Sequence, residues 1–108
     1  MASYLASGPS SFASIAGTDA ALVVLGAATT GRKQRLLALA CHAGAAGCTF
    51  RLASGATALT GNMTVGANGP VVWPEAIGGW AESAAGAALN LVVTAGAING
   101  CAVVQAIA

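Results

Sequence analysis

The chain has 108 residues, of which four are Lys or Arg, three are Asp or Glu and one is His, and its formal net charge is +1. This length suits a single domain. So few charged residues exclude a polybasic nucleic-acid surface, an acidic tail and a carboxylate-rich metal cage. Hydrophobic residues make up 56% of the chain and its mean hydropathy is +0.78. Disorder is therefore not expected, and a surface this apolar must be covered by a membrane or by other subunits.

Residues 1–19 differ from the rest of the chain because they are serine-rich, carry no charge before Asp19 and are interrupted by Pro9. They show no strand or helix periodicity, so we predict an extended N-terminal arm. Its large apolar side chains are spaced as anchors for grooves on a neighbouring subunit. These anchors are Tyr4, Leu5, Phe12 and Ile15. The alternative is a disordered terminus.

Residues 20–108 are divided by glycines into short segments rich in Leu, Val, Thr and Ala. Short segments of even spacing between turn residues are typical of antiparallel β-sandwiches and barrels. Strands are predicted at 20–28, 34–43, 47–53, 56–65, 70–73, 87–95 and 101–107. We therefore predict an all-β protein, an antiparallel β-sandwich of jelly-roll-like or immunoglobulin-like form over residues 20–108, preceded by the arm.

Side-chain alternation predicts which residues share a face of these strands, because successive strand residues point to opposite sides of the sheet. One predicted apolar face combines Leu37, Leu39 and Cys41, and another combines Cys48, Phe50 and Leu52. The opposite side of the second strand holds Thr49, Arg51 and Ala53, a set suited to a contact surface. Many outward positions hold Ala where an isolated sheet would carry Lys or Glu.

The one cluster of charge follows the predicted turn at Gly31 and consists of Arg32, Lys33 and Arg35. We interpret it as a solubilising hairpin tip. The alternatives are a salt contact with an acidic partner surface and, less favoured, phosphate binding. Nucleic acid is not an expected partner, because no aromatic residues lie nearby to stack on bases.

Cys41 and Cys48 flank residues 42–47, which have the length of a hairpin loop. In such a hairpin the two sulfurs would face each other across the strands, close enough for a disulfide bond. The alternative, which we favour, is that both cysteines are small buried thiols in the core. His42 and Cys41 are consecutive, so they point to opposite faces and make a poor catalytic pair. One His and three scattered Cys lack the spacing of a zinc site.

Glu75 and Glu82 lie on either side of Ile77–Trp80, where paired carboxylates would suit a hydrolase. Nothing in the sequence fixes their separation, so we expect solvated loop acids. The chain has no nucleophile elbow, phosphate-binding loop or dinucleotide fingerprint. We expect a protein that is not an enzyme and uses no cofactor or metal.

Trp73 and Trp80 flank the loop 74–79, which is rich in Pro and Gly. Tryptophans are over-represented at binding hot spots, and they also close the open ends of β-sandwiches. We expect one residue in each role, with Trp80 the more buried of the two.

A membrane protein with Ala/Gly-rich helices is the alternative of a different class, since Ser83–Ala108 carries no charge. The apolar residues of this segment alternate with a period of two, and four amide or hydroxyl side chains interrupt it, which favours strands. No basic n-region precedes the first apolar run, so no signal peptide is expected. We expect a chain made in the cytoplasm, with no membrane partner.

The pattern of turns and strands resembles a known class of viral protein. The segments that carry the resemblance are Thr49–Gly55, Met63–Val65, Asn68–Pro74, Gly79–Trp80, Gly86–Leu91 and the closing strand Ala102–Ile107. They are similar to the small β-sandwich structural proteins of tailed bacteriophages, notably capsid decoration (cement) proteins and head or tail accessory proteins. The resemblance spans about residues 28–108 and does not cover the arm.

This resemblance implies a non-enzymatic virion protein, often a trimer, that binds the outside of the capsid and reinforces capsomer junctions. The major capsid protein and other copies of the chain would be its partners. The residues expected at the partner interface are Tyr4, Leu5, Phe12, Arg32, Lys33, Arg35, Trp73 and Trp80. A head–tail connector or tail accessory protein is the alternative within the same class.

Overall fold

The computed structural model describes residues 10–107, and this part of the chain is all-β, as predicted, with no helix. The strands are β1 (Ser10–Thr18), β2 (Leu22–Gly26), β3 (Lys33–Ser54), β4 (Thr57–Ala58), β5 (Met63–Val65), β6 (Pro70–Trp73), β7 (Ala81–Glu82) and β8 (Leu89–Ile107). All strand pairings are antiparallel and join in one eight-stranded sheet. Residues 10–107 contain no helix that is long and apolar enough to cross a membrane.

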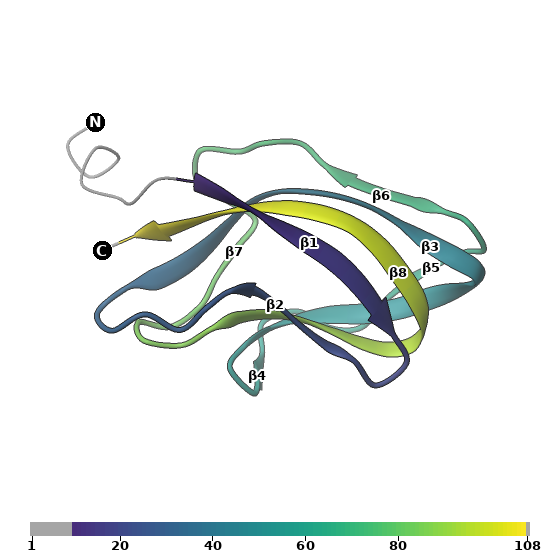
Figure 1. The fold of residues 1–108 in the computed structure, drawn as a ribbon, viewed down its shortest axis with the longest axis horizontal. Helices are drawn as coiled ribbons and strands as arrows, with labels where there is room; N and C mark the ends of the chain where they lie inside the picture. The colour runs from purple at the N-terminus through teal and green to yellow at the C-terminus, as the bar shows by residue number, and fades with distance from the viewer. Residues whose placement is uncertain (1–9, 108) are drawn as a thin grey trace.

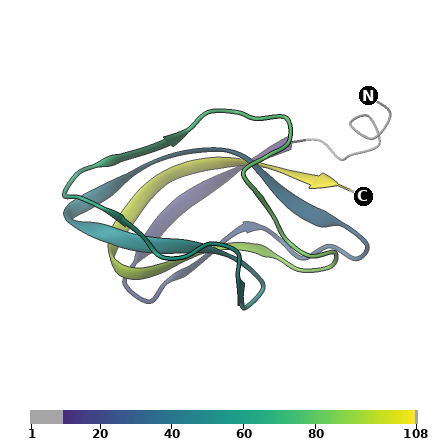
Figure 2. The same ribbon diagram turned by 180° about the vertical axis from the view of Figure 1, so that it is seen from behind.

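The two long strands β3 and β8 form a ribbon from which the rest of the sheet is built. They pair from Lys33 opposite Ile107 to Ser54 opposite Leu89. One half of the ribbon is bordered by β1 on β8 and by β6 and β7 on β3, and the other half by β2 on β8 and by β4 and β5 on β3. The ribbon bends in its middle, so that the half with β1 and β6 lies over the half with β2 and β4 (Figures 1 and 2).

The bend occurs where the pairing of β3 with β8 shifts register, between Ala43 and Cys48. Opposite this shift, Gly96 has a φ of +73°, and a Cβ on it would overlap the carbonyl oxygen of Gly47. Only glycine adopts this backbone conformation at little cost while leaving room for such a close approach. The two strands therefore turn the corner together without separating.

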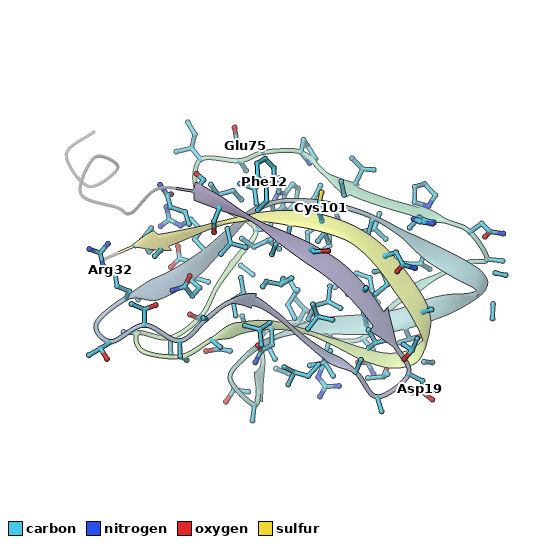
Figure 3. All side chains as sticks on the ribbon, in the orientation of Figure 1. Phe12, Asp19, Arg32, Glu75 and Cys101 are labelled. Carbon is cyan, nitrogen blue, oxygen red and sulfur yellow. The ribbon has the colours of Figure 1, made fainter. Side chains whose placement is uncertain are left out.

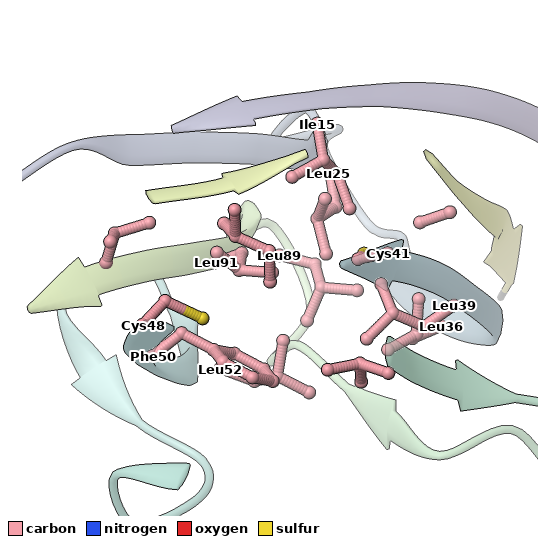
Figure 4. Packing of buried hydrophobic residues seen from close by; sticks show 14 of the residues in the cluster. Ile15, Leu25, Leu36, Leu39, Cys41, Cys48, Phe50, Leu52, Leu89 and Leu91 are labelled. Atoms are coloured by element: carbon pink, nitrogen blue, oxygen red, sulfur yellow. The ribbon is translucent and has the colours of Figure 1, made fainter. Parts of the chain in front are cut away.

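The core lies between the two halves of the bent sheet (Figure 4). Phe50 and Leu52 enter it from one half of β3, and Leu36 and Leu39 enter it from the other. Strand β8 supplies Leu89, Leu91, Val93, Ile98, Ala102 and Val104. The face predicted for Cys48, Phe50 and Leu52 is confirmed, because all three are buried in this cluster.

Several predicted boundaries are wrong, for one shared reason. The predicted strands 34–43 and 47–53 are parts of the single strand β3, and 87–95 and 101–107 are parts of β8. Residues 42–47 are therefore not a hairpin loop: the small side chains of residues 43–47 permit a bend rather than a reversal of the chain. The prediction at 70–73 matches β6, whereas 56–65 contains two short strands with a turn between them.

A register shift between Leu36 and Ala38 also moves one predicted core residue. Leu37 was expected to share a face with Leu39 and Cys41; it is buried, but it lies outside their cluster, and Leu36 takes its place there. The carbonyl oxygen of Leu37 accepts a hydrogen bond from the backbone N–H of Ala76 at 3.1 Å. The irregularity thus ties the loop after β6 to β3.

Residues 10–18, which the sequence assigns to the arm, are strand β1 of the sheet and pair with β8 from Ser10 opposite Gln105 to Thr18 opposite Ala97. Ile15 was expected to be an anchor for a neighbour, but it is only 2% exposed and belongs to the core. The expected anchors Tyr4 and Leu5 lie outside the described residues.

Candidate functional site

The outer surface of the half that contains β1 and β6 is apolar, and we call it the apolar face. Its apolar residues are Phe12, Ala38, Ala40, Val72, Pro74, Cys101 and Val103, and the uncharged polar residues Ser14, His42 and Asn99 lie on the same side toward the bend. Directly opposed residues in antiparallel strands point to the same side of a sheet. Phe12 lies opposite Val103, which lies opposite Ala38 in turn. The next row of the face runs from Cys101 on β8 through Ala40 on β3 to Val72 on β6.

Two large side chains of the apolar face extend into solvent. Phe12 is 83% exposed and Val72 is 66% exposed, and Cys101 is exposed between the strands that carry them (Figure 3). The segments that cross this face, 12–16, 38–42, 70–74 and 99–103, contain no Asp, Glu, Lys or Arg. The strands of the face therefore lack the charges that usually discourage contact between sheets, and Glu75, the residue after Pro74, is an exposed charge at its border.

A groove of about 230 Å³ runs along the apolar face. Its floor contains the short side chains of Ala38, Ala40 and Cys101, and Val72 and Pro74 line it on the side of β6. The difference in side-chain length between floor and wall creates the hollow. The groove suits an apolar side chain, because its lining is almost wholly apolar.

The two tryptophans stack at the edge of the sheet, and the expectation that Trp80 would be the more buried is wrong. Trp80 is 47% exposed, whereas Trp73 is partly buried. The ring of Trp73 lies between those of Phe50 and Trp80, with centroid distances of 6.5 and 5.4 Å. Trp80 Nε1 donates a hydrogen bond of 2.8 Å to the carbonyl oxygen of Pro74. Trp73 thus connects this exposed ring with the core.

The basic cluster does not act as one surface. Arg35 lies opposite Glu82, and its Nε and Nη2 lie 2.7 and 2.6 Å from Oε2 of that carboxylate. Arg32 is partly buried in the turn before β3, and Lys33 is exposed. The guanidinium of Arg35 is therefore already paired within the chain, and Lys33 is the more accessible cation of the cluster.

The buried thiols are poor nucleophiles. The pKa of Cys41 is raised from 9.0 to about 11, chiefly by burial and also by the nearby thiols of Cys101 and Cys48, while a hydrogen bond from the Cys101 backbone lowers it. Burial also raises the pKa of Cys48. Both are free cysteines in the core cluster. Neither is a thiolate near neutral pH, and nucleophilic chemistry requires the thiolate.

Other candidate catalytic side chains are not gathered at one place. His42 is exposed and Cys41 is buried, as the alternation along β3 predicts. Glu75 is exposed on the loop after β6, and Glu82 is paired with Arg35. Across residues 10–107, no group of three His, Cys, Asp or Glu side chains is placed to hold a metal ion.

The outer surface of the other half is more polar, and we call it the mixed face. Its polar part is formed by Thr49, Arg51, Thr64 and Thr94, and its apolar part by Leu22 and Val24 of β2. Thr94 Oγ1 donates to the carbonyl oxygen of Thr49 at 3.2 Å. The two outer faces of one sheet thus differ in chemistry, and the apolar face is the candidate interaction surface.

Of the large apolar residues of this surface, the sequence predicted only Phe12 as an interface residue. It also predicted the neighbouring Trp73 and Trp80 at the interface. It missed Val72, Cys101 and Val103. Their signal was present, because they are outward positions of strands in which both alternating sets are apolar or small. In such strands the sequence does not identify the outward set of side chains until the partner strands are known.

A comparison of the chain with protein-family models, with curated proteins and with solved structures finds no match. The function must therefore be argued from the chemistry of the surface.

Proposed function

We propose that this chain is a non-enzymatic virion structural protein, a decoration protein that binds the outer surface of a tailed-phage head and stabilises capsomer junctions. Its partners are the major capsid protein and further copies of itself, and a trimer is the expected oligomer. In this proposal the two halves of the bent sheet are the two layers of a β-sandwich, jelly-roll-like or immunoglobulin-like in form.

The observation that carries the proposal is the exposure of large apolar side chains on a sheet that lacks protective charges. Phe12 and Val72 on the apolar face, and Leu22 and Val24 on the mixed face, are all more than half exposed. Contiguous apolar surface of this kind marks interaction sites. Its burial contributes about 25 cal/mol per Å² before the cost of association is subtracted.

A decoration protein has to cover a broad, shallow surface, and the side chains of this chain suit that task. Ala, Val, Thr and Cys dominate the outward positions at Ala38, Ala40, Val72, Cys101 and Val103. Short or branched side chains lose little rotamer entropy when they are buried. A net charge of +1 also limits the repulsion between many copies placed side by side.

The test is binding to phage heads that lack their decoration protein. The purified full chain is mixed with these heads, and sedimentation measures the bound fraction over a range of concentrations. We expect saturable binding to the shell. Electron microscopy of the mixture then locates the bound chains. Density over the head surface supports the proposal, density confined to one vertex or to the tail supports a connector or tail accessory protein instead, and no binding overturns both.

A further inference from the structure

We propose that the apolar face is a self-association surface, on which two copies pack so that Phe12 of each copy enters the groove of the other. This inference goes beyond the proposed function, since it concerns a two-fold contact of the isolated chain that needs no capsid and is separate from the trimer expected there. It rests on two features of the face, its lack of charge and its shape, and the area of the face sets the expected affinity.

The chemistry of the face selects an apolar partner surface without charges. A charged partner would lose hydration against this face without gaining an ion pair, because segments 12–16, 38–42, 70–74 and 99–103 carry no charged residue. A second copy of the same face meets this requirement. The mixed face meets it less well, since Arg51 lies on it.

The shape of the face is complementary to itself. Phe12 is a projecting side chain on β1, and the groove over Ala38 and Ala40 is a hollow on β3, with Val103 of β8 between them. Two strand spacings separate projection and hollow, which is about 10 Å. A two-fold axis that runs along β8 in the interface places each Phe12 over the groove of the other copy. This is the reciprocal pattern of an isologous contact.

The same arrangement brings the two Cys101 side chains close together. Cys101 lies on β8, one row from Val103, and is exposed. Because the proposed axis follows β8, each Cys101 faces its counterpart across the interface. Cys41 and Cys48 are buried, so Cys101 is the thiol that reports on this contact.

The area of the face predicts a weak pair. Four strands about 4.8 Å apart, with about six residues each at about 3.3 Å, give a face of roughly 400 Å² per copy. Stable interfaces bury about 1,200–2,000 Å² in total, so the contact belongs to the weak, reversible class. On a particle, where neighbouring copies are held close together, a weak contact gains from the high effective concentration.

The test is sedimentation equilibrium of the full chain from about 1 μM to about 1 mM, the range in which weak pairs dissociate. We expect a reversible monomer–dimer equilibrium in the wild type. Phe12→Ser removes the projection, and Ala40→Gln fills the hollow; each is expected to weaken association at least about tenfold, as loss of a hot spot does. Leu22→Ser on the mixed face is the matched control, since Leu22 is also a large exposed strand residue, 55% exposed, and it should leave the equilibrium unchanged.

Circular dichroism establishes that each variant is folded. Crosslinking of Cys101 supplies a second readout of association. A short bis-maleimide should crosslink Cys101 to its counterpart in the wild type, and the yield should fall in Phe12→Ser and Ala40→Gln. The inference is overturned by a wild type that stays monomeric over the whole range, or by association that only Leu22→Ser weakens. It is also overturned if Phe12→Ser weakens association and Ala40→Gln does not, since that pattern indicates pairing along the edge of β1. Failure here is distinguishable from failure of the proposed function, because binding to phage heads is measured in a separate assay with a different partner.

Discussion

Replacing Gly96 by alanine tests whether the close approach of β3 and β8 at the bend is required for the fold. A Cβ at position 96 would overlap the carbonyl oxygen of Gly47 and lie 2.9 Å from Cys48 Cα. Both neighbours are backbone atoms, so a side chain cannot move aside to make room. The strands must separate where the two halves of the core meet.

The expected cost has two parts. Alanine at a φ of +73° costs about 1–2 kcal/mol for the left-handed conformation alone. Relief of the overlap adds about 1–3 kcal/mol, which is typical of overpacking. Gly31→Ala is the matched control, because Gly31 has a φ of +72° but no atom within 4 Å of its added Cβ. The difference between the two variants therefore isolates the contact between strands.

Urea unfolding followed by tryptophan fluorescence measures both variants, at a protein concentration low enough to avoid self-association. With a slope of about 1–2 kcal/mol per M, the overlap cost should lower the midpoint of Gly96→Ala by about 0.5–3 M more than that of Gly31→Ala. Equal midpoints for the two variants would refute the proposed role of Gly96 in the bend.

Three further predictions concern the interior and one ion pair. Phe50→Ala should lower the free energy of unfolding by about 3–5 kcal/mol in the same urea assay, because it leaves a cavity beside Trp73; a loss below about 1 kcal/mol would contradict the packing of this core. Glu82→Gln should cost less than about 1 kcal/mol, and the cost should shrink further in high salt, since the Arg35–Glu82 side chains are 25% and 32% exposed; a salt-independent cost would argue against an ionic contribution. The free energy of unfolding should fall as the pH rises from 9.0 to about 11, because the folded chain keeps the proton on Cys41 that the unfolded chain releases. Cys41→Ala should make this fall less steep, and an unchanged slope in that variant would contradict the role of Cys41.

The sequence predicted the fold class because alternation and glycine spacing are local signals. Cys48, Phe50 and Leu52 share a face whatever their partners are, and they are buried together as expected. The continuity of β3 through residues 42–47 was not predictable in the same way. Glycines and alanines are compatible with a turn, a loop or a bend, and the choice depends on Gly96 lying across from them.

The candidate surface was predictable only in part, for a related reason. Phe12 was predicted as an interface anchor of an extended arm, and it is exposed, but the segment that carries it is a strand and not an arm. The relative burial of Trp73 and Trp80 depended on which of them lay beside Phe50, a contact between distant parts of the chain. Long-range pairing therefore determines the site, and a local pattern does not encode it.

The open edges of the sheet help to decide how partners attach. On the side of β3, the border is divided among β4, β5, β6 and β7, which are only two to four residues long. Edges as short as these offer a poor template for an added strand. On the side of β8, however, β1 is nine residues long and carries Phe12.

Phe12 therefore belongs both to the apolar face and to the longest free edge, so its substitution alone cannot distinguish packing on the face from pairing along the edge. Ala40 separates the two modes, because it lies on β3 at the floor of the groove and two strands away from that edge. Packing on the face requires this hollow to stay open, whereas pairing of backbone along β1 does not involve it.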